Sequence, residues 1–404
     1  MPDLPGSLSI IWALGCCLSG AAGEAAKPQG PPPPEAFAYV FSVGYGTVDH
    51  FPQDERAFEQ LLVHLKDSGY NTIHCVYRDW RLPLCRKHGV KMMIDVLAWK
   101  EGAETDIRRP AQQAAVQAIC EKVRGDKGVW GYNLWNEKLA FFGRPEGKSI
   151  NHYLGLLRQW DPTHPVWVGT YRNHYPQAVA GNPGVFGYYD YHWRRGMHWH
   201  FALLSWYQGL LNERDAFLGR WIYTHDYNRN LYTLTTSIAH GLKVCIGFLG
   251  GPLDKRGRWN PDHHFCRIGR KMHTLWPELM RIGRPLAVYS TPTSRTPDNR
   301  DKEPGIPQHL TPFPADHWLQ VKQGEAVVGF FRHADGSDTV YVANHNAFAW
   351  QGMVLGLAKS DAPVKAWQFD REAGQWAPFE PGQRFSFPLA PGDGELFKFR
   401  RGTE

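Results

Sequence analysis

The sequence predicts an α/β chain in which a (β/α)8 TIM barrel is followed by a small antiparallel β-domain. Eight apolar, strand-like runs alternate with helix-like segments over roughly 250 residues, a length typical of such a barrel. The helical period then disappears after residue 283. From there on, short β-rich runs are separated by turn signals such as ADGSD and PGDGE, which predicts an antiparallel domain.

The eight expected barrel strands are short apolar or aromatic runs. They cover residues 36–46, 71–77, 91–99, 129–137, 165–171, 185–193, 220–226 and 243–251. Helices are expected over 54–70, 81–89, 110–125, 149–160, 200–215 and 230–242, whereas RNHYPQAVAGNPG, after the fifth strand, offers little to build one. A doubly wound sheet is the competing fold. No glycine-rich phosphate loop follows the first strand, which argues against the nucleotide-binding version of that fold.

The rest of the chain divides by composition. Residues 1–26 contain an apolar run followed by small residues, which predicts a signal peptide, although the first residues carry no Lys or Arg. Residues 27–35 are a Pro-rich linker, 36–283 the barrel, and 284–404 a β-sandwich-like domain with a structural or accessory role. Carbohydrate binding by that domain is the less favoured alternative. We expect a secreted or periplasmic protein, with lipid attachment at Cys16 or Cys17 disfavoured.

Charge and cysteine content argue against several classes of function. The net charge of +6 is spread over 404 residues rather than gathered into a run, so no nucleic-acid partner is expected. Seven cysteines without a CxxC pair argue against structural zinc. DHH (262–264) and HWH (198–200) are expected to be solvated or capping histidines, so we expect no metal and no cofactor. After residue 26 no segment is apolar for long enough to span a bilayer.

The carboxyl ends of the expected strands carry acids, imidazoles and large rings. Barrel enzymes build their sites from these ends. Sugars have one apolar face and a rim of hydroxyls, so aromatic platforms beside carboxylates suit a glycan. The residues expected to bind substrate here are Trp80, Trp99, Asp190, Tyr191, His192, Trp193 and His225. The simpler interpretation is that many of the 17 Trp fill a large core.

The stretch VWGYNLWNE (129–137) reads as a buried strand that ends on Asn136 and Glu137. The triplet WNE at the end of a fourth barrel strand resembles the Asn-Glu signature of the clan A glycoside hydrolases, which include cellulases, mannanases and β-galactosidases. The resemblance covers the barrel. It implies that Glu137 is the general acid/base and that Asn136 contacts the sugar 2-hydroxyl. Without it, the two residues would simply begin a polar loop.

The seventh expected strand departs from this family pattern. The clan places a nucleophilic Glu there, whereas IYTHDYN contains none and Asp226 is the nearest carboxylate. An Asp before NRNLYTL also fits a helix N-cap. Asp is one methylene shorter than Glu, which favours a base over a nucleophile, because inversion needs carboxyls about 6.5–9.5 Å apart and retention about 5–5.5 Å. If Asp226 is not the second acid, Asp79, Glu101 and Asp190 are the next candidates.

The function expected from these features is a secreted glycoside hydrolase that cleaves an O-glycosidic bond of a plant or microbial oligo- or polysaccharide. Rings such as Trp99 and Trp135 should raise the pKa of Glu137, so that it stays protonated near neutrality. The alternative, from another class, is a barrel that lost its second carboxylate and only binds carbohydrate. A carboxylate facing Glu137 across the barrel mouth would separate the two.

Overall fold

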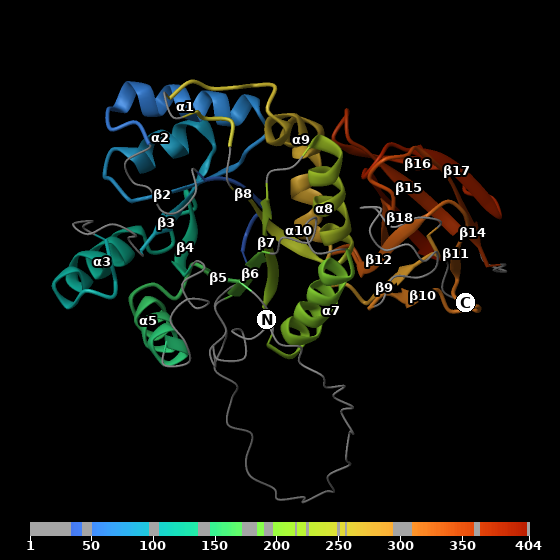
Figure 1. Cartoon of the computed structure of the whole chain (residues 1–404), viewed down its shortest axis with the longest axis horizontal. Coiled ribbons are helices and arrows are strands. Elements are labelled where there is room, and N and C mark those ends of the chain that lie inside the picture. Colours follow the sequence, from blue (N-terminus) through green and yellow to red (C-terminus); the bar gives the residue numbers. More distant parts are fainter. Residues whose placement is uncertain are drawn as a thin grey trace, which may run out of the picture.

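The barrel predicted from the sequence is present and closed. The computed structural model describes residues 34–42, 51–96, 105–135, 146–171, 184–189, 197–214, 216–223, 226–248, 251–254, 257–293, 309–358 and 364–401. Eight parallel strands follow one another around the barrel in chain order, and the last pairs with the first (Figure 1). They are β1 (Ala38–Phe41), β2 (Thr72–Cys75), β3 (Lys91–Asp95), β4 (Val129–Trp135), β5 (Val166–Tyr171), β6 (Gly184–Tyr189), β7 (Phe217–Tyr223) and β8 (Leu242–Phe248).

The helices cover the outside of the barrel. They are α1 (Glu55–Asp67), α2 (Arg81–His88), α3 (Pro110–Val123), α5 (Glu146–Trp160), α7 (Met197–Arg214), α8 (Tyr227–Ala239), α9 (His264–Met272), the 3-10 turn η2 (His273–Leu275) and α10 (Trp276–Arg281). Helix α1 shows why these segments fold locally. The Asp54 carboxylate accepts a hydrogen bond from the Ala57 amide at 2.8 Å and caps the first turn. Residues 172–183, where little helix was expected, lie outside the described residues.

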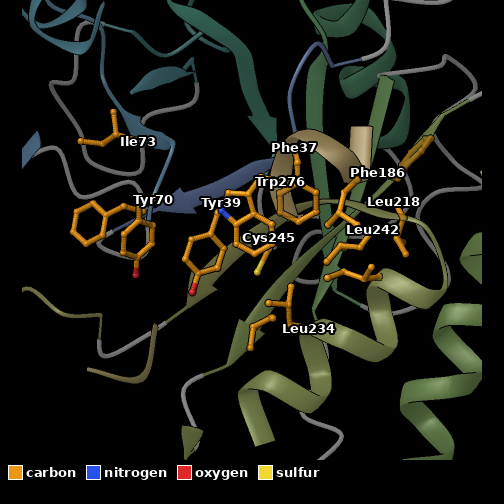
Figure 2. Packing of buried hydrophobic residues seen from close by; sticks show 14 of the residues in the cluster. Phe37, Tyr39, Tyr70, Ile73, Phe186, Leu218, Leu234, Leu242, Cys245 and Trp276 are labelled. Carbon is orange, nitrogen blue, oxygen red and sulfur yellow. The ribbon is translucent and has the colours of Figure 1, made fainter. Parts of the chain in front are cut away.

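The main hydrophobic core lies between the outer face of the barrel and these helices. Figure 2 shows side chains from β1, β2, β6, β7 and β8 meeting residues of α8 and α10. Phe37 stacks on Trp276 with ring centroids 4.6 Å apart. The Tyr39 hydroxyl, on β1, donates a hydrogen bond to the Phe265 carbonyl at 2.8 Å, so this buried ring also keeps its polar group paired.

Large aromatic rings fill part of the barrel interior. Trp167 of β5 is fully buried and makes an edge contact with Trp221 of β7, with ring centroids 6.3 Å apart. Two glycines make room for it. A Cβ at Gly187 or Gly219 would lie 1.9 Å or 2.1 Å from atoms of the Trp167 ring. The barrel is therefore a packed core and not a pore.

The C-terminal part forms two antiparallel layers, as expected for a β-domain. Seven strands make one sheet, in the order β10-β9-β12-β13-β18-β15-β16, and three make the other, in the order β11-β14-β17. Their side chains form a second hydrophobic core. The bounds are β9 (Ala287–Ser290), β10 (Thr311–Pro312), β11 (Leu319–Gln323), β12 (Ala326–Arg332), β13 (Asp338–Asn344), β14 (Gln351–Leu357), β15 (Val364–Asp370), β16 (Gln375–Phe379), β17 (Arg384–Leu389) and β18 (Gly394–Arg401).

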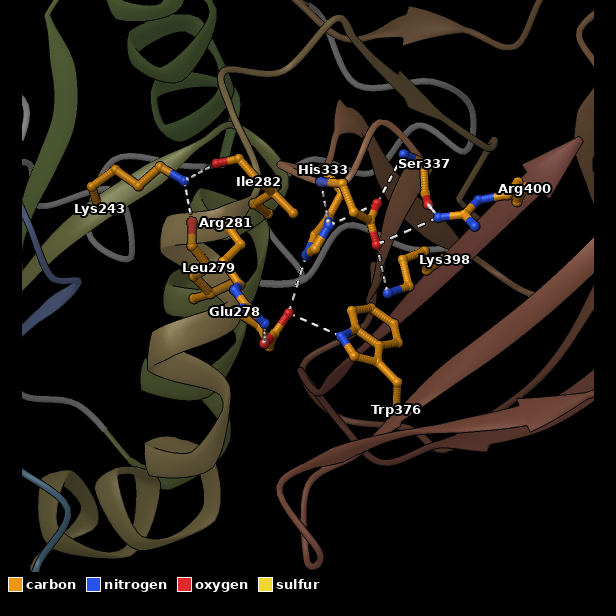
Figure 3. A network of polar contacts seen from close by, with 11 residues as sticks. Lys243, Glu278, Leu279, Arg281, Ile282, His333, Ser337, Trp376, Lys398 and Arg400 are labelled. Carbon is orange, nitrogen blue, oxygen red and sulfur yellow. Dashed lines mark hydrogen bonds and ion pairs between the residues drawn. The ribbon is translucent and has the colours of Figure 1, made fainter.

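The β-domain packs on the side of the barrel that carries α8, as Figure 1 shows. Strand β12 approaches α8 so closely that a Cβ at Gly329 would lie 2.1 Å from the Ala239 carbonyl oxygen. The seam also contains buried polar links, drawn in Figure 3. The Glu278 carboxylate of α10 accepts hydrogen bonds from Trp376 Nε1 at 2.9 Å and from His333 Nε2 at 3.2 Å. Burial opposes ionisation of Glu278, but these donors and Arg281 hold its pKa below its usual range.

The described cysteines are buried thiols without disulfide partners. They are Cys75, Cys85, Cys120, Cys245 and Cys266. Burial raises the pKa of Cys75 and of Cys120 to about 12, so neither is an activated nucleophile near neutral pH. Within the described ranges, no helix is long and apolar enough to cross a membrane.

Two histidines are buried at the seam between barrel and β-domain. His240 ends α8, and its Nδ1 lies 2.8 Å from the Thr236 carbonyl. His345 follows β13 and stacks on Tyr232 of α8, with ring centroids 6.1 Å apart. Burial lowers the pKa of His240 to about 4, and burial together with the nearby His240 lowers that of His345 to about 3. Both rings are therefore neutral in the folded protein near neutral pH.

We expect the seam to lose stability in acid. Both histidines bind protons less readily when folded, so below about pH 6.5 the unfolded chain takes up more protons and the free energy of unfolding falls, until about pH 4 for His240 and about pH 3 for His345. Each proton contributes a slope of at most about 1.4 kcal/mol per pH unit. His345→Gln should flatten the dependence of Tm on pH over this window, measured by calorimetry.

The matched control is His152→Gln, which removes an exposed histidine from α5 and should leave the slope of the wild type. Equal slopes for His345→Gln and the wild type would show that His345 is not the group that takes up the proton on unfolding.

Candidate functional site

A layer of four buried polar side chains lies at the carboxyl ends of the first four strands. Ser42 follows β1, His74 is the penultimate residue of β2, Asp95 ends β3, and Asn133 lies two residues before the end of β4. Each is at most 5% exposed. Asp95 and Asn133 are direct neighbours in the strand register, and the pairing of Phe41 with Ile73 places Ser42 beside His74. We call these four residues the polar layer.

Hydrogen bonds join the polar layer into one network. The Asn133 amide nitrogen lies 3.0 Å from His74 Nε2 and 3.2 Å from Asp95 Oδ1. His74 Nδ1 lies 3.2 Å from the Ser42 hydroxyl. An amide nitrogen has two hydrogens and can donate to both neighbours at once. In this arrangement His74 Nε2 accepts, and its Nδ1–H donates to Ser42.

One acceptor of the layer remains unused. The Asn133 side-chain oxygen is buried and has no hydrogen-bond partner in the described part of the chain. A buried polar atom without a partner costs about 1–3 kcal/mol, so proteins rarely keep one without a reason. A ligand hydroxyl group that reaches the polar layer would donate the missing hydrogen bond to the Asn133 oxygen.

A buried arginine holds the backbone around this side of the mouth. Arg81 is fully buried at the start of α2, and its guanidinium donates to the Val76 carbonyl at 3.2 Å and to the Pro52 carbonyl at 3.1 Å. It therefore ties the segment before α1 to the chain that leaves β2. The rings of Phe58 and Trp80 lie against the guanidinium, each with its centroid 5.0 Å from Cζ.

Asp226 lies at the carboxyl end of β7, but the strand ends earlier than expected. Strand β7 covers Phe217–Tyr223 rather than 220–226, and Asp226 is the N-cap of α8. Its carboxylate accepts a hydrogen bond from the Arg229 amide at 2.9 Å and lies 3.4 Å from Arg229 Nε. The side chain is 55% exposed. The capping geometry foreseen as the alternative is thus present, and an exposed carboxylate remains at the rim.

Two further candidates lie among the described residues. Trp80 is half-buried, and its ring makes an edge contact with Phe58 of α1, with centroids 5.3 Å apart. Packing between α1 and α2 therefore accounts for at least part of its surface. Asp79 is exposed and forms an ion pair with Lys122 of α3 at 2.7 Å, which lowers its pKa. It links the segment between β2 and α2 to α3 at the surface.

The other predicted site residues lie outside the described residues. They are Asn136, Glu137, Trp99, Glu101, Asp190, Tyr191, His192, Trp193 and His225. Their roles remain predictions. Trp99 and Glu101 follow β3, and Asn136 and Glu137 follow β4, and the structure shows that both of these strands carry residues of the polar layer.

The sequence reasoning missed the polar layer because it considered mainly residues at and beyond the strand ends. A usable signal was present. Side chains alternate along a strand, so His74 in TIHC and Asn133 in VWGYNLW interrupt apolar runs at positions that face one side. A polar residue inside a buried barrel strand needs partners of its own kind, and neighbouring strands supply them here.

In each of the two histidine motifs that might suggest metal binding, one described histidine has a structural role, and His200 is buried rather than solvated or capping as expected. His263 caps α9 by accepting from the Phe265 amide at 3.3 Å. His200 Nε2 lies 2.8 Å from the Thr236 hydroxyl, in a buried network with Arg220. Among the residues that the structure describes, no group of three or more His, Cys, Asp or Glu side chains is placed to hold a metal ion.

Comparison with known proteins identifies relatives in fold. No family model and no curated protein sequence matches the chain. Two solved structures each align with a TM-score of 0.50. One is a putative alpha-galactosidase from Bacteroides fragilis NCTC 9343, 11% identical over 92% of this chain and 79% of that chain. The other is an isomalto-dextranase from Arthrobacter globiformis T6, 12% identical over 94% of this chain and 76% of that chain. At these identities the likeness is one of fold, and the shared fold is a closed (β/α)8 TIM barrel with a β-domain.

Proposed function

We propose that the chain is a glycoside hydrolase that cleaves an O-glycosidic bond of a plant or microbial oligo- or polysaccharide. The observation that carries the proposal is the polar layer at the carboxyl ends of β1–β4, with its unused acceptor on Asn133. Barrel enzymes work at this end, and a hydroxyl-rich ligand is the natural donor for such an acceptor. The proposed export by residues 1–26 would place the enzyme among these glycans.

In the proposed mechanism Glu137 is the general acid. It follows the last residue of β4 by two positions, on the strand that also carries Asn133. Glu137 gives its proton to the glycosidic oxygen as the bond to the anomeric carbon breaks. Water attacks that carbon from the opposite face and loses a proton to a second carboxylate, for which Asp226 is the candidate. Asn136 would hold the 2-hydroxyl, with Trp80, Trp99, Asp190, Tyr191, His192, Trp193 and His225 lining the sugar site.

The second candidate function is a barrel that binds carbohydrate without cleaving it. The capping of α8 by Asp226 favours this alternative, because a carboxylate held by a helix amide already has a structural task. Both functions use the same mouth and the same class of ligand. They differ in what happens when single carboxylates are changed.

The first test is a screen of aryl glycosides and soluble polysaccharides with the wild type and Glu137→Gln. Removing the acid should lower kcat by about 10²–10⁴-fold on substrates with poor leaving groups. Glu137→Ala should retain most of the rate on aryl glycosides with good leaving groups, because these need little protonation. Equal losses on good and poor leaving groups would argue that Glu137 is not the proton donor. A wild type that binds but never cleaves would establish the second function.

Asp226→Asn separates the capping role from the chemical role. Asn is as good an N-cap as Asp, so α8 should keep its cap while the carboxylate is lost. If Asp226 is the base, Asp226→Asn should lose at least about 10²-fold in kcat with an unchanged Tm, and azide should restore part of the rate. The measurements are initial rates and thermal unfolding.

The control is Asp54→Asn, which makes the same change at the N-cap of α1. It should keep wild-type activity and Tm. Near-normal turnover by Asp226→Asn, with a stability loss of about 1 kcal/mol only in Asp226→Ala, would show that Asp226 is purely a cap.

Asn133→Leu tests the polar layer. Leu has the same branched outline as Asn, although it is larger, and it removes both the donor to His74 and Asp95 and the unused acceptor, so we expect kcat/KM to fall about 10- to 100-fold. The control is Tyr132→Phe on the same strand. It removes the 2.6 Å hydrogen bond from the Tyr132 hydroxyl to Asp161 on the outer face, so it should lower Tm and spare kcat/KM. Equal activity loss in both variants would mean that only stability is being measured.

A further inference from the structure

Two large aromatic side chains are exposed on the turn between β13 and β14. Trp350 is 70% exposed and Phe348 is 53% exposed. Among the described residues the only other large hydrophobic side chain with such exposure is Leu286. Exposed aromatic rings that lie together on one turn are a common sign of a binding surface.

The turn is held in a fixed shape by two asparagines. The Asn346 side-chain oxygen accepts hydrogen bonds from the amides of Phe348 at 2.9 Å and Ala349 at 3.0 Å. The Asn344 side chain bridges the turn, because its oxygen accepts from the Asn346 amide and its nitrogen donates to the Ala349 carbonyl. The backbone that carries the two rings is therefore ordered before any ligand arrives.

The same turn reaches the rim of the barrel mouth. The Arg229 guanidinium lies over the Phe348 ring, 5.6 Å from its centroid, and its Nε lies 3.4 Å from the Asp226 carboxylate. The Asn346 carbonyl accepts from the Gly392 amide, and a Cβ at Gly392 would meet the Asn228 carbonyl at 2.6 Å. Asp226, Asn228 and Arg229 belong to the first turn of α8, which begins at the carboxyl end of β7.

We propose that Trp350 and Phe348 form a sugar-binding platform that extends the barrel mouth onto the β-domain and binds a saccharide unit remote from the cleaved bond. The proposal rests on the proposed function and specifies its substrate as a chain of several sugars. Arg229, which lies between the Phe348 ring and the Asp226 carboxylate at the rim, offers a donor for sugar hydroxyls.

The surroundings favour a sugar over a protein partner. Exposed apolar patches of several hundred Å² mark protein interfaces, whereas here the Phe348 ring adjoins the charged guanidinium of Arg229. A flat ring with open edges next to hydrogen-bonding groups matches a pyranose, which has an apolar face and polar edges.

The test compares Trp350→Ala, Phe348→Ala and the control Leu286→Ala. Leu286 is 65% exposed in the same domain but lies near Arg284, which contacts Phe217 at the amino end of β7. Binding is measured by affinity electrophoresis in the Glu137→Gln background with hydroxyethyl cellulose, xylan, galactomannan and dextran. Rates are measured with the same variants in protein that retains Glu137. The substrates are any polysaccharide that is cleaved and an aryl monoglycoside.

Trp350→Ala should weaken polysaccharide binding and lower kcat/KM on the polysaccharide about tenfold, which is roughly 1.4 kcal/mol. The aryl monoglycoside should be cleaved at the wild-type rate, because it does not reach the platform. Phe348→Ala should show a smaller loss in the same direction, and Leu286→Ala none.

The outcomes separate this inference from the proposed function. Hydrolysis with no difference between Trp350→Ala and Leu286→Ala would overturn the platform and leave the hydrolase standing. Binding that depends on Trp350, without any hydrolysis, would support the platform and overturn the hydrolase. An equal loss on the aryl monoglycoside, or a Glu137→Gln protein with Trp350 and Phe348 intact that binds none of the four polysaccharides, would overturn the platform.

Discussion

Helix α8 is buried over most of its length, and the relation between the barrel and the β-domain depends on it. Residues 230–239 are all buried, because the helix packs on β7 and β8 on one side and on β12 and β13 on the other. A helix in this position cannot expose its polar side chains to solvent, so they need hydrogen-bond partners within the protein. Several of them bond to the backbone of the helix itself, since the Thr236 hydroxyl donates to the Tyr232 carbonyl at 2.7 Å and the Ser237 hydroxyl to the Thr233 carbonyl at 2.6 Å. The Thr235 hydroxyl donates to the Gly392 carbonyl of the β-domain at 2.7 Å. The polar segment TLTTS (233–237) can therefore be buried between the barrel and the β-domain.

The interior of the barrel is packed in two different ways, by large rings at one level and by the polar layer at another. Lower in the barrel, Trp167 fills the interior and requires glycines at 187 and 219, so this level has no room for a ligand. At the carboxyl ends of β1–β4 the interior side chains are short and polar, and their hydrogen bonds fix them to one another. A preorganised set of donors and acceptors at that level costs little reorganisation when a hydroxyl-rich molecule binds.

Much of this arrangement could be predicted from the sequence, and the failures have physical causes. All eight barrel strands were predicted because buried parallel strands are apolar runs bounded by turn residues. The β-rich runs predicted after residue 283 were WLQVKQG, AVVGFFRH, DTVYVANH, KAWQFD, QWAPF and ELFKFR, so the short strands β9 and β10 and the strands β14 and β17 were missed. Gly352 and Gly356 interrupt β14 and Pro388 interrupts β17, which weakens the strand signal of each. The seventh strand was placed three residues late, at 220–226. Arg220, the first residue of that range, is buried within the strand, and its partners Tyr188, His200 and Ser237 come from elements distant in sequence. The polar layer was missed because polar residues inside apolar runs mark single positions, and a local pattern does not show that residues from four strands meet.

Buried charges at the seam explain how a turn of the β-domain can belong to a site on the barrel. Arg371, after β15, donates to the Asp393 carboxylate at 2.9 Å and also binds Glu395, while Lys271 of α9 reaches Asp393 at 2.7 Å. Burial opposes ionisation of Asp393, but Arg371 and Lys271 hold its pKa below its usual range. Breaking one member of such a cluster leaves an uncompensated buried charge, so the cluster admits few relative positions of α9 and the β-domain. Asp393 adjoins Gly392, which packs on the first turn of α8. The same contacts that fix the domains therefore also fix the distance between the exposed turn at Phe348 and the rim at Asp226.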